Sequence, residues 1–580
     1  MFDGFKMQGY NREFFKRFWF LIKPYWTSEE KWKAYGLLSL ITFGIIFQVM
    51  VNVQVNRFYK TFYDAIQEMN ARVVLLSIFQ FSLIVTAYLL VAGYSAYFTG
   101  RLTIHWRRWL TQHYLNHWLK KNNFYRMEVL NLSIDNPDQR ISEDLDFFPV
   151  LTIGLYHGFL SALLNLISFS IILWNLSSNF PIHFLRFEVP GYLFWTAFFY
   201  AVIGTVLTIK IGRWLPFLNY MQQQYNANFR FGLVRVREFN EQIALFGGQN
   251  TEEKFLEKNF SFIFSNFLKI IKLQLYLNFF RNGYMQIANI IGACAALPLF
   301  FAKKIKFGGL TQISSAFGEV ISALSFFIVA FFDIANWHAV IYRLTEFEHR
   351  MQLADKHESL EHIEIKKDPG QTDLQCKQVM LYLPTREVLL ENFNFTIHQG
   401  DHVLIMGETG SGKSTLLRFL GGIWPYGRGE IILPQVSMLF LPQRPYFPLG
   451  SLKEALAYPG NADESSPKEM KLVLQACDLG VLTERLEEVN YWSKELSLGE
   501  QQKLAFARVL LQKPAWVFLD EATSALDSRS ESRMYELFKK HLPALTLVSV
   551  GHRESLVAWH ERRLTLIKGG EAQEGHALVS

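Results

Sequence analysis

The most distinctive chemistry in the sequence lies in one glycine-rich segment that follows an apolar run at 402–406 and opens a helical pattern. This order of strand, loop and helix is the context of a P-loop, in which backbone N–H groups converge on phosphate oxygens at a helix N-terminus. Lys413 would supply a positive charge to the β- and γ-phosphates, and Ser414 a hydroxyl to Mg²⁺. The expected phosphate-binding residues are Gly407, Gly410, Ser411, Gly412, Lys413, Ser414 and Thr415.

Two adjacent carboxylates complete this chemistry. Asp520 and Glu521 end the apolar run 516–519, about a hundred residues after the P-loop. Asp520 is expected to hold Mg²⁺ through water, and Glu521 to polarise an attacking water as a general base. An isolated Asp-Glu pair is usually only a solvated strand end, but the preceding complete P-loop favours the catalytic interpretation.

The elements that must position these residues belong to an α/β domain. Apolar runs at 379–383, 393–397 and 402–406 are typical of strands, and the run at 516–519 of a buried strand in a parallel sheet. A charged stretch and the break signal Pro369–Gly370 precede them. We therefore predict a linker at 351–370 and a nucleotide-binding domain at 371–580.

The composition of the whole chain indicates a second, more apolar part. The 580 residues include 53 Phe, only 19% are charged, and their mean hydropathy is +0.09. This composition excludes disorder, a collagen-like chain and a disulfide scaffold, and a mean near zero argues against a wholly membrane-embedded chain. The three Cys fit no metal spacing.

Apolar runs long enough to cross a bilayer lie in the first 350 residues. Five runs contain no Asp, Glu, Lys or Arg, and a sixth is weaker because its apolar core, 320–332, has only 13 residues. A wholly soluble helical protein is disfavoured by so many runs. We predict an all-α transmembrane domain at 1–350 with spans near 34–56, 73–100, 147–175, 189–209, 282–302 and 313–335.

The distribution of Lys and Arg predicts the topology. With the N-terminus inside, the inner connections hold 24 of them and the outer connections seven, although three of those seven cluster at 303–306. This asymmetry follows the positive-inside rule and returns the C-terminal domain to the inner side. No cleavable signal peptide is expected. Residues 11–24 are predicted to form an amphipathic helix on the inner membrane surface, with an ordinary core helix as the alternative.

Between the P-loop and the carboxylates lies the segment Leu496-Ser-Leu-Gly-Glu-Gln-Gln502, and here the sequence resembles the ATP-binding cassette (ABC) transporter family. The segment is similar to the family's signature motif, with Leu498 and Glu500 replacing the commoner Gly and Gln. Six motifs in order carry the resemblance. The remaining ones are Gln443 as the Q-loop, Ser524-Ala-Leu-Asp527 as the D-loop and His552 as the switch histidine.

The resemblance implies roles for these residues. Gln443 and His552 would join Glu521 in catalysis, with Gln443 also near Mg²⁺. Ser497 and the Gly499 amide would contact the nucleotide of an opposite subunit, so that a C2 homodimer forms two composite ATP sites, and Asp527 is expected to be a further nucleotide-binding residue. Tyr382 lies near the place of the family's adenine-stacking aromatic residue, although one alignment puts a Leu there. The implied cofactors are ATP and Mg²⁺, and the implied membrane domain has the exporter-type fold.

Further segments resemble one branch of the family, which includes peroxisomal fatty-acyl-CoA transporters, the lysosomal cobalamin transporter and bacterial importers of cobalamin, bleomycin or antimicrobial peptides. They are Asp135–Ile141, the signature variant, Ile243–Gly248 and the acidic stretch Glu238–Glu253. The branch implies an ATP-driven half-transporter in the bacterial inner membrane that moves a bulky hydrophilic solute, with import or export left open.

Two other functions stay open at this point, namely export of a lipid-like or fatty-acyl substrate and an ATP-gated regulatory membrane protein. A soluble ABC-type ATPase is excluded by the apolar runs, and no basic stripe with interleaved aromatic residues indicates nucleic acid. Glu319 and Asp333 lie about four helical turns apart, so both could face one side of the sixth span. They could line a polar cavity, take part in proton coupling, or lie at an interface.

Overall fold

The computed structural model describes residues 12–132, 136–178, 182–184, 187–357, 363–368, 370–567 and 573–576. The chain divides into two compact units, which are described separately. The first takes in residues up to Leu115 and Asn136–Glu348, and the second takes in Asn116–Asp135 and the chain from His349 onward. Asp135 of the branch motif lies outside the described residues, as do 358–362 and 369 of the predicted linker.

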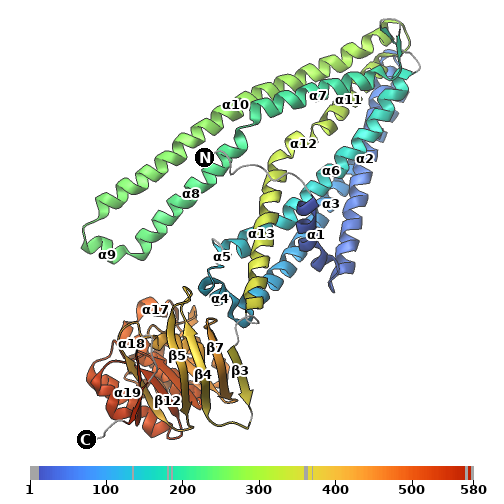
Figure 1. The fold of residues 1–580 in the computed structure, drawn as a ribbon. Helices are drawn as coiled ribbons and strands as arrows, with labels where there is room; N and C mark the ends of the chain where they lie inside the picture. Colours follow the sequence, from blue (N-terminus) through green and yellow to red (C-terminus); the bar gives the residue numbers. More distant parts are fainter. Residues whose placement is uncertain are drawn as a thin grey trace. The chain divides into compact units, whose positions relative to one another are not determined.

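The first unit consists mainly of long helices (Figure 1). Five helical segments in the described chain are long and apolar enough to cross a membrane: Lys31–Gln67, Ala71–Leu119, Pro137–Ser178, Tyr192–Glu238 and Gln249–Phe301. The helices of this unit are α1 (Arg12–Trp26), α2 (Lys31–Gln67), α3 (Ala71–Leu119), α5 (Pro137–Gln139), α6 (Leu145–Ser178), α7 (Tyr192–Gly212), α8 (Leu215–Glu238), α9 (Asn240–Leu245), α10 (Gln249–Phe301), α11 (Phe307–Leu324), α12 (Phe326–Val329) and α13 (Phe331–His357).

The sixth predicted span differs most from expectation. Instead of one helix over 313–335, the structure has α11, α12 and the start of α13, which are separated by single residues at Ser325 and Ala330. Glu319 therefore belongs to α11 and Asp333 to α13. The shared face that was predicted from their spacing assumed one uninterrupted helix, and the roles of both carboxylates stay predictions.

The core of this unit forms where α6, α7, α10 and α11 meet. Phe169, Ala197, Ala296 and Phe317 are completely buried there. A Cβ on Gly292 of α10 would lie 3.1 Å from the Phe317 side chain, so the bare glycine allows α11 to pack closely.

Helix α1 has apolar side chains in two different environments. Phe14 is buried and its ring lies 5.4 Å from that of Trp337, whereas Phe15 and Trp19 are 56% and 62% exposed. The predicted single apolar face is thus divided between packing on the bundle and a free apolar surface. The location of that surface at the membrane stays a prediction.

The second unit combines two large sheets with flanking helices (Figure 1), and the short strands β9 (Gly450–Ser451) and β10 (Val489–Asn490) form a separate two-stranded pair. In the six-stranded sheet the order is β14-β13-β6-β12-β11-β8, and in the four-stranded sheet it is β3-β7-β4-β5. The strands are β3 (Ile363–Asp368), β4 (Leu374–Tyr382), β5 (Val388–Ile397), β6 (His402–Gly407), β7 (Gly427–Pro434), β8 (Met438–Leu441), β11 (Trp516–Asp520), β12 (Thr546–Val550), β13 (Arg562–Leu566) and β14 (Gln573–His576).

The main helices of this unit are α4 (Asn123–Val129), α14 (Lys413–Leu420), α15 (Leu452–Ala457), α16 (Pro467–Ala476), α17 (Trp492–Glu495), α18 (Leu498–Gln512) and α19 (Ser528–His541). One of them, α14, begins at the predicted site residue Lys413, and the predicted site residues Ser497 and Asp527 are the N-caps of α18 and α19. The four predicted strands match β4, β5, β6 and β11. Two features differ from the predicted organisation. Strand β3, inside the predicted linker, pairs in parallel with β7, and the described part of Asn116–Asp135 clusters with this unit.

Candidate nucleotide site

The predicted catalytic residues follow neighbouring parallel strands. Strand β12 pairs with β6 on one side and with β11 on the other, and Val550 is in register with both Ile405 and Asp520. Because the strands are parallel, their carboxyl ends lie at one edge of the sheet, where ligands of open α/β sheets bind. This arrangement brings together the P-loop after β6, the carboxylates that end β11 and the turn with His552 after β12.

The P-loop has the backbone that close contact with phosphate requires. Gly407, Gly410 and Gly412 have φ angles of 147°, 85° and 94°, which glycine adopts without strain. A Cβ on Gly407 would lie 2.5 Å from the Leu566 carbonyl oxygen, so no larger residue fits. Gly412 is the N-cap of α14. These conformations are the ones that allow loop amide groups to converge on a phosphate at a helix N-terminus.

Side chains of the loop also fit a phosphate group. The Lys413 ammonium donates hydrogen bonds of 2.8 Å to the Gly407 and Glu408 carbonyl oxygens. Among the described residues the Ser411 hydroxyl has no partner, although it is completely buried. A buried polar atom without a partner is unfavourable unless a ligand or water satisfies it. The loop thus provides both a positive charge and an unsatisfied donor.

The residues predicted to hold Mg²⁺ are already in contact. The Ser414 hydroxyl donates to Asp520 Oδ1 over 2.9 Å. Burial raises the pKa of Asp520, and the hydrogen bond from Ser414 and the charges of Arg418 and Lys413 oppose this rise. A hydroxyl and a carboxylate oxygen are the type of ligand that Mg²⁺ prefers, so the donor set fits the ion.

Glu521 lies between Gln443 and His552. The Gln443 amide donates to Glu521 Oε2 over 3.0 Å, and His552 Nδ1 lies 3.7 Å from Oε1. The Glu521 backbone has a left-handed φ of 48°, and its N–H donates to the Val550 carbonyl. Such strained backbone costs ~1–3 kcal/mol and clusters at functional sites. The three residues predicted to cooperate in catalysis are therefore neighbours.

The signature residues occupy the start of α18. Ser497 caps this helix, and the Ser497 and Glu500 side chains form a reciprocal capping box. Hydrogen bonds from the Ser497 hydroxyl and backbone N–H lower the pKa of Glu500. A Cβ on Gly499 would lie 3.4 Å from the Ala525 carbonyl oxygen. The Glu in place of the commoner Gln therefore keeps Ser497 fixed at the helix N-terminus.

Asp527 caps α19 in the same way, since its carboxylate accepts the Ser530 N–H over 2.8 Å. The backbone hydrogen bond from Ser530 lowers the pKa of Asp527. In the described chain Ser497, Gly499 and Asp527 make no hydrogen bond to the P-loop. The action of Ser497 and Gly499 on an opposite nucleotide and the binding of nucleotide by Asp527 stay predictions.

Tyr382 is half-buried at the end of β4. Its ring packs against the apolar cluster of the second unit, and its hydroxyl donates to the Met380 sulfur over 2.6 Å. Trp424 donates its indole N–H to the Tyr382 carbonyl. The predicted stacking of Tyr382 on adenine stays a prediction.

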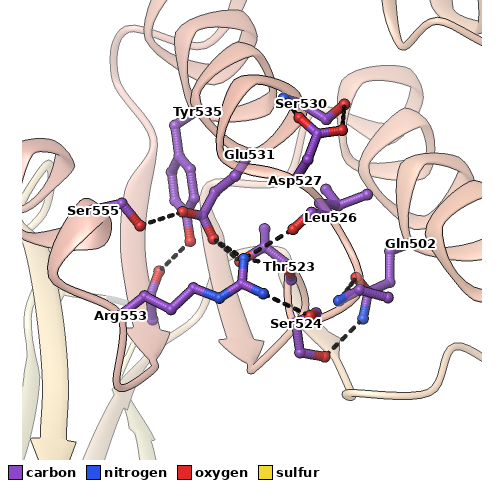
Figure 2. A network of polar contacts seen from close by, with 12 residues as sticks. Gln502, Thr523, Ser524, Leu526, Asp527, Ser530, Glu531, Tyr535, Arg553 and Ser555 are labelled. Atoms are coloured by element: carbon purple, nitrogen blue, oxygen red, sulfur yellow. Dashed lines mark hydrogen bonds and ion pairs between the residues drawn. The ribbon is translucent and has the colours of Figure 1, made fainter.

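Sequence reasoning missed four polar residues that organise this edge, namely Gln502, Arg508, Glu531 and Arg553. Arg508 donates to the Ala455 carbonyl over 2.7 Å and to the Tyr446 carbonyl over 2.7 Å, and burial lowers its pKa to about 10. The other three belong to the network in Figure 2. The available signal was a polar side chain at a helix position facing the core, such as Gln502, two residues before the apolar run that begins at Leu504.

Comparisons with known proteins agree with this geometry. The model "ABC transporter transmembrane region 2" matches residues 21–301, and the model "ABC transporter" matches residues 390–524. An "Uncharacterized ABC transporter ATP-binding protein" of Haemophilus influenzae is 35% identical over 96% of this chain and 93% of its own length.

Two named relatives are also similar along nearly the whole chain. "ABC transporter D family member 2, chloroplastic" of Arabidopsis thaliana is 32% identical over 95% of this chain and 86% of its own length. "Lysosomal cobalamin transporter ABCD4" of Homo sapiens is 25% identical over 96% of this chain and 95% of its own length.

A solved structure shows the same fold. The "Structure of a bacterial Atm1-family ABC exporter with ATP bound" matches with a TM-score of 0.73 and 18% identity, over 95% of this chain and 96% of that one. The likeness covers the helical membrane domain and the α/β nucleotide-binding domain together. The chain therefore belongs to the ABC transporter family, as an ATP-driven half-transporter whose cassette is an ATPase coupled to transport.

Proposed function

We propose that this chain moves a bulky hydrophilic solute across a bacterial inner membrane as a homodimer. The observation that carries the catalytic part is the convergence of the P-loop, the Ser414–Asp520 pair and Glu521 at one sheet edge. The inner-membrane location is supported by the relative "Inner membrane ABC transporter ATP-binding protein YddA" of Escherichia coli, which is 31% identical over 92% of this chain.

Each residue at the sheet edge has a role in the proposed hydrolysis. Lys413 leaves the loop carbonyls and pairs with the β- and γ-phosphates, while the P-loop amides and Ser411 bind the phosphate oxygens. Ser414, Asp520 and Gln443 would hold Mg²⁺, which neutralises phosphate charge when bound. Glu521 orients and deprotonates the attacking water, and His552 steadies the Glu521 carboxylate from the opposite side to Gln443.

The proposed homodimer is supported by apolar side chains at the end of α9. Leu245 and Phe246 are 80% and 90% exposed, and Tyr446 and Leu449, a few residues after Gln443, are 61% and 75% exposed. Exposed apolar side chains of this kind mark interaction surfaces. In the proposed dimer the partner's cassette covers the tip of α9, and Ser497, Gly499 and Asp527 complete the partner's ATP site.

The hydrophilic solute is supported by polar atoms inside the membrane unit. In the described part of this unit, several side-chain oxygens are buried without a hydrogen-bond partner: Asn56 Oδ1, Ser95 Oγ, Asn165 Oδ1, Ser170 Oγ, Gln312 Oε1 and Ser314 Oγ. Such atoms are costly among apolar side chains, and they favour a second conformation in which water or a polar cargo reaches them. The relative named as a cobalamin transporter supports a solute of this class.

The catalytic proposal is tested by two substitutions in the purified full chain. We expect Glu521→Gln to lower ATP turnover about 10²–10⁴-fold by removing the general base, and Lys413→Ala to weaken nucleotide binding. Glu536→Gln, an exposed glutamate on α19, is the matched control and should turn over ATP normally. Normal turnover in both site variants would disprove the proposed mechanism, and a wild type that binds ATP without turnover would support the ATP-gated regulator.

The same inactive variant tests the homodimer. When wild type is mixed with an excess of Glu521→Gln chains before reconstitution, activity per wild-type chain should fall, because mixed dimers contain a defective composite site. Activity that depends only on the amount of wild-type chain would contradict ATP sites that are shared between two subunits.

A further inference from the structure

A partly buried polar network connects the segments that carry Gln443, Glu521 and His552, yet none of its central side chains has been given a role in binding or hydrolysing ATP. Figure 2 shows the network around Arg553 and Glu531. Arg553 follows His552 directly, and Thr523 follows Glu521 by two residues. Members of the network are therefore close neighbours in sequence of two of the proposed catalytic residues.

Arg553 holds the loop after Glu521 through its backbone. Its guanidinium donates to the carbonyl oxygens of Ser524 over 2.8 Å and Leu526 over 2.9 Å, with a longer contact of 3.4 Å to Thr523. Three carbonyls of one short loop thus converge on one side chain. Only a planar, multidentate donor can make this set of contacts, so Lys cannot replace Arg fully here.

Glu531 holds Arg553 and the loop from the side of α19. Its carboxylate is completely buried and accepts the Thr523 hydroxyl over 2.7 Å and the Ser555 hydroxyl over 2.5 Å. Arg553 Nη1 lies 3.4 Å from the same carboxylate. A buried charge is costly unless it is paired and hydrogen-bonded, and Glu531 meets both conditions.

Gln502 holds the other end of the same loop from α18. It is completely buried, its Oε1 accepts the Ala525 N–H over 2.9 Å, and its Nε2 donates to the Ser524 hydroxyl over 3.1 Å. The same Nε2 lies 3.2 Å from the Gln443 carbonyl. Gln502 therefore connects the segment carrying Gln443 to the loop that Arg553 holds.

We propose that Arg553, together with Glu531 and Gln502, positions Glu521 between Gln443 and His552, so that ATP turnover depends on side chains that never touch the nucleotide. The separations at stake are the 3.0 Å contact of Glu521 with Gln443 and its 3.7 Å distance from His552. A displacement of ~1 Å at a reacting group can cost ~10²-fold in rate. This inference rests on the proposed catalytic role of Glu521.

The first test is a kinetic comparison in the purified full chain. Arg553→Gln should lower kcat about 10²-fold while KM for ATP changes less than about threefold, because the P-loop is untouched. Arg553→Lys should recover part of kcat, since it keeps the charge but not the planar set of donors. Arg533→Gln is the matched control, because Arg533 lies on α19 in an exposed ion pair with Asp478 outside the network.

The second test separates positioning from simple stabilisation. Arg553→Gln alone leaves the buried Glu531 carboxylate uncompensated and should lower the thermal unfolding midpoint. The double variant Glu531→Gln/Arg553→Gln removes both charges and should recover much of the lost thermal stability. Its kcat should stay low, because no guanidinium donates hydrogen bonds to the loop carbonyls. If kcat returned in step with the midpoint, the network would be structural only and the proposal wrong.

Normal kcat in Arg553→Gln would also overturn the inference, and so would a loss of kcat matched by an equal loss of nucleotide affinity. Glu521→Gln is measured in parallel, so that failure of the positioning role can be distinguished from failure of the proposed function. An inactive Glu521→Gln variant together with normal ATP turnover in Arg553→Gln would disprove only the positioning role. Should the buried-site variants fail to fold, Ser555→Ala, which removes a single hydrogen bond to Glu531, provides the milder variant and should lower kcat by a smaller factor.

Discussion

At the residue scale, His560 shows how burial fixes a protonation state. The imidazole is 2% exposed, and its ring nitrogens contact the Leu556 carbonyl at 2.7 Å and the Ser549 hydroxyl at 2.8 Å. Because a carbonyl only accepts, Nδ1 must carry the proton and Nε2 must accept from Ser549. Burial lowers the pKa of His560 to about 4, and the nearby His402 acts in the same direction.

This residue predicts a pH dependence of stability. The unfolded chain binds a proton at His560 with an ordinary pKa of about 6.5, whereas the folded chain does so only near 4, so the free energy of unfolding should decrease as pH falls from about 6.5 to 4. The contribution is at most about 3 kcal/mol. His560→Gln should flatten this part of the profile, measured by thermal unfolding of the full chain.

His541→Gln, at an exposed histidine of α19, is the control and should leave the profile unchanged. An equally steep acid slope in His560→Gln would show that other groups cause it.

The sequence could indicate which motif residues lie together at one sheet edge, although their roles stay predictions, whereas it contained no sign of the residues that bind backbone. Lys413, Asp520 and Glu521 were identified because phosphate and Mg²⁺ chemistry requires those side chains in a set order. Arg553 escaped because its partners are carbonyl groups, which every residue has. Its contact with Glu531, 22 positions earlier, follows only from the fold.

At the element scale, helix α4 is the clearest addition of the structure to the sequence. The segment lies among residues predicted as transmembrane domain, yet Val129 and Leu130 pack against the apolar cluster of the cassette. Tyr426 donates its hydroxyl to the Val129 carbonyl over 3.2 Å. The charges and helical period of 101–146 are typical of helices that extend beyond the membrane, but a seven-residue helix has too few turns to reveal which surface it covers.

Polar contacts also fix the chain where α4 begins. His117 Nε2 lies 2.8 Å from Asp355 Oδ2, and the Asn123 amide donates to Asp355 Oδ1 over 3.1 Å. Asn123 is completely buried. The end of α3, the start of α4 and the end of α13 are thus joined within one compact unit.

This packing predicts that a charge at Val129 releases α4. Val129→Asp would place a carboxylate in an apolar contact, which costs several kcal/mol unless the helix detaches, so protease cleavage within 116–132 should become faster. ATP turnover should stay within about threefold of wild type, because the residues of the nucleotide site are not altered. Val481→Asp, at an 87% exposed position of the same unit, is the control. Unchanged cleavage in Val129→Asp would show that α4 is not held by this contact.

At the scale of the whole molecule, the mean hydropathy near zero combines two unlike parts. A helical membrane domain and an α/β cassette follow one another in one chain, and their order could be predicted because apolar runs and motifs are local in sequence. The solute could not be predicted in the same way. Buried polar atoms of the membrane unit lie on different helices, such as Asn56 on α2 and Gln312 on α11, and packing alone brings them together.

Uptake by cells tests the proposed solute class and its direction. Cells that express the chain should accumulate more labelled cobalamin or bleomycin than cells that express Glu521→Gln, because only the active ATPase would drive the proposed uptake of a hydrophilic solute. The inactive variant controls for expression and passive entry. Equal accumulation of both labels would argue against import of these solutes. Loss of a labelled fatty-acyl compound from cells with the active chain would instead support the lipid-like export alternative, since that cargo needs no polar partner along its path.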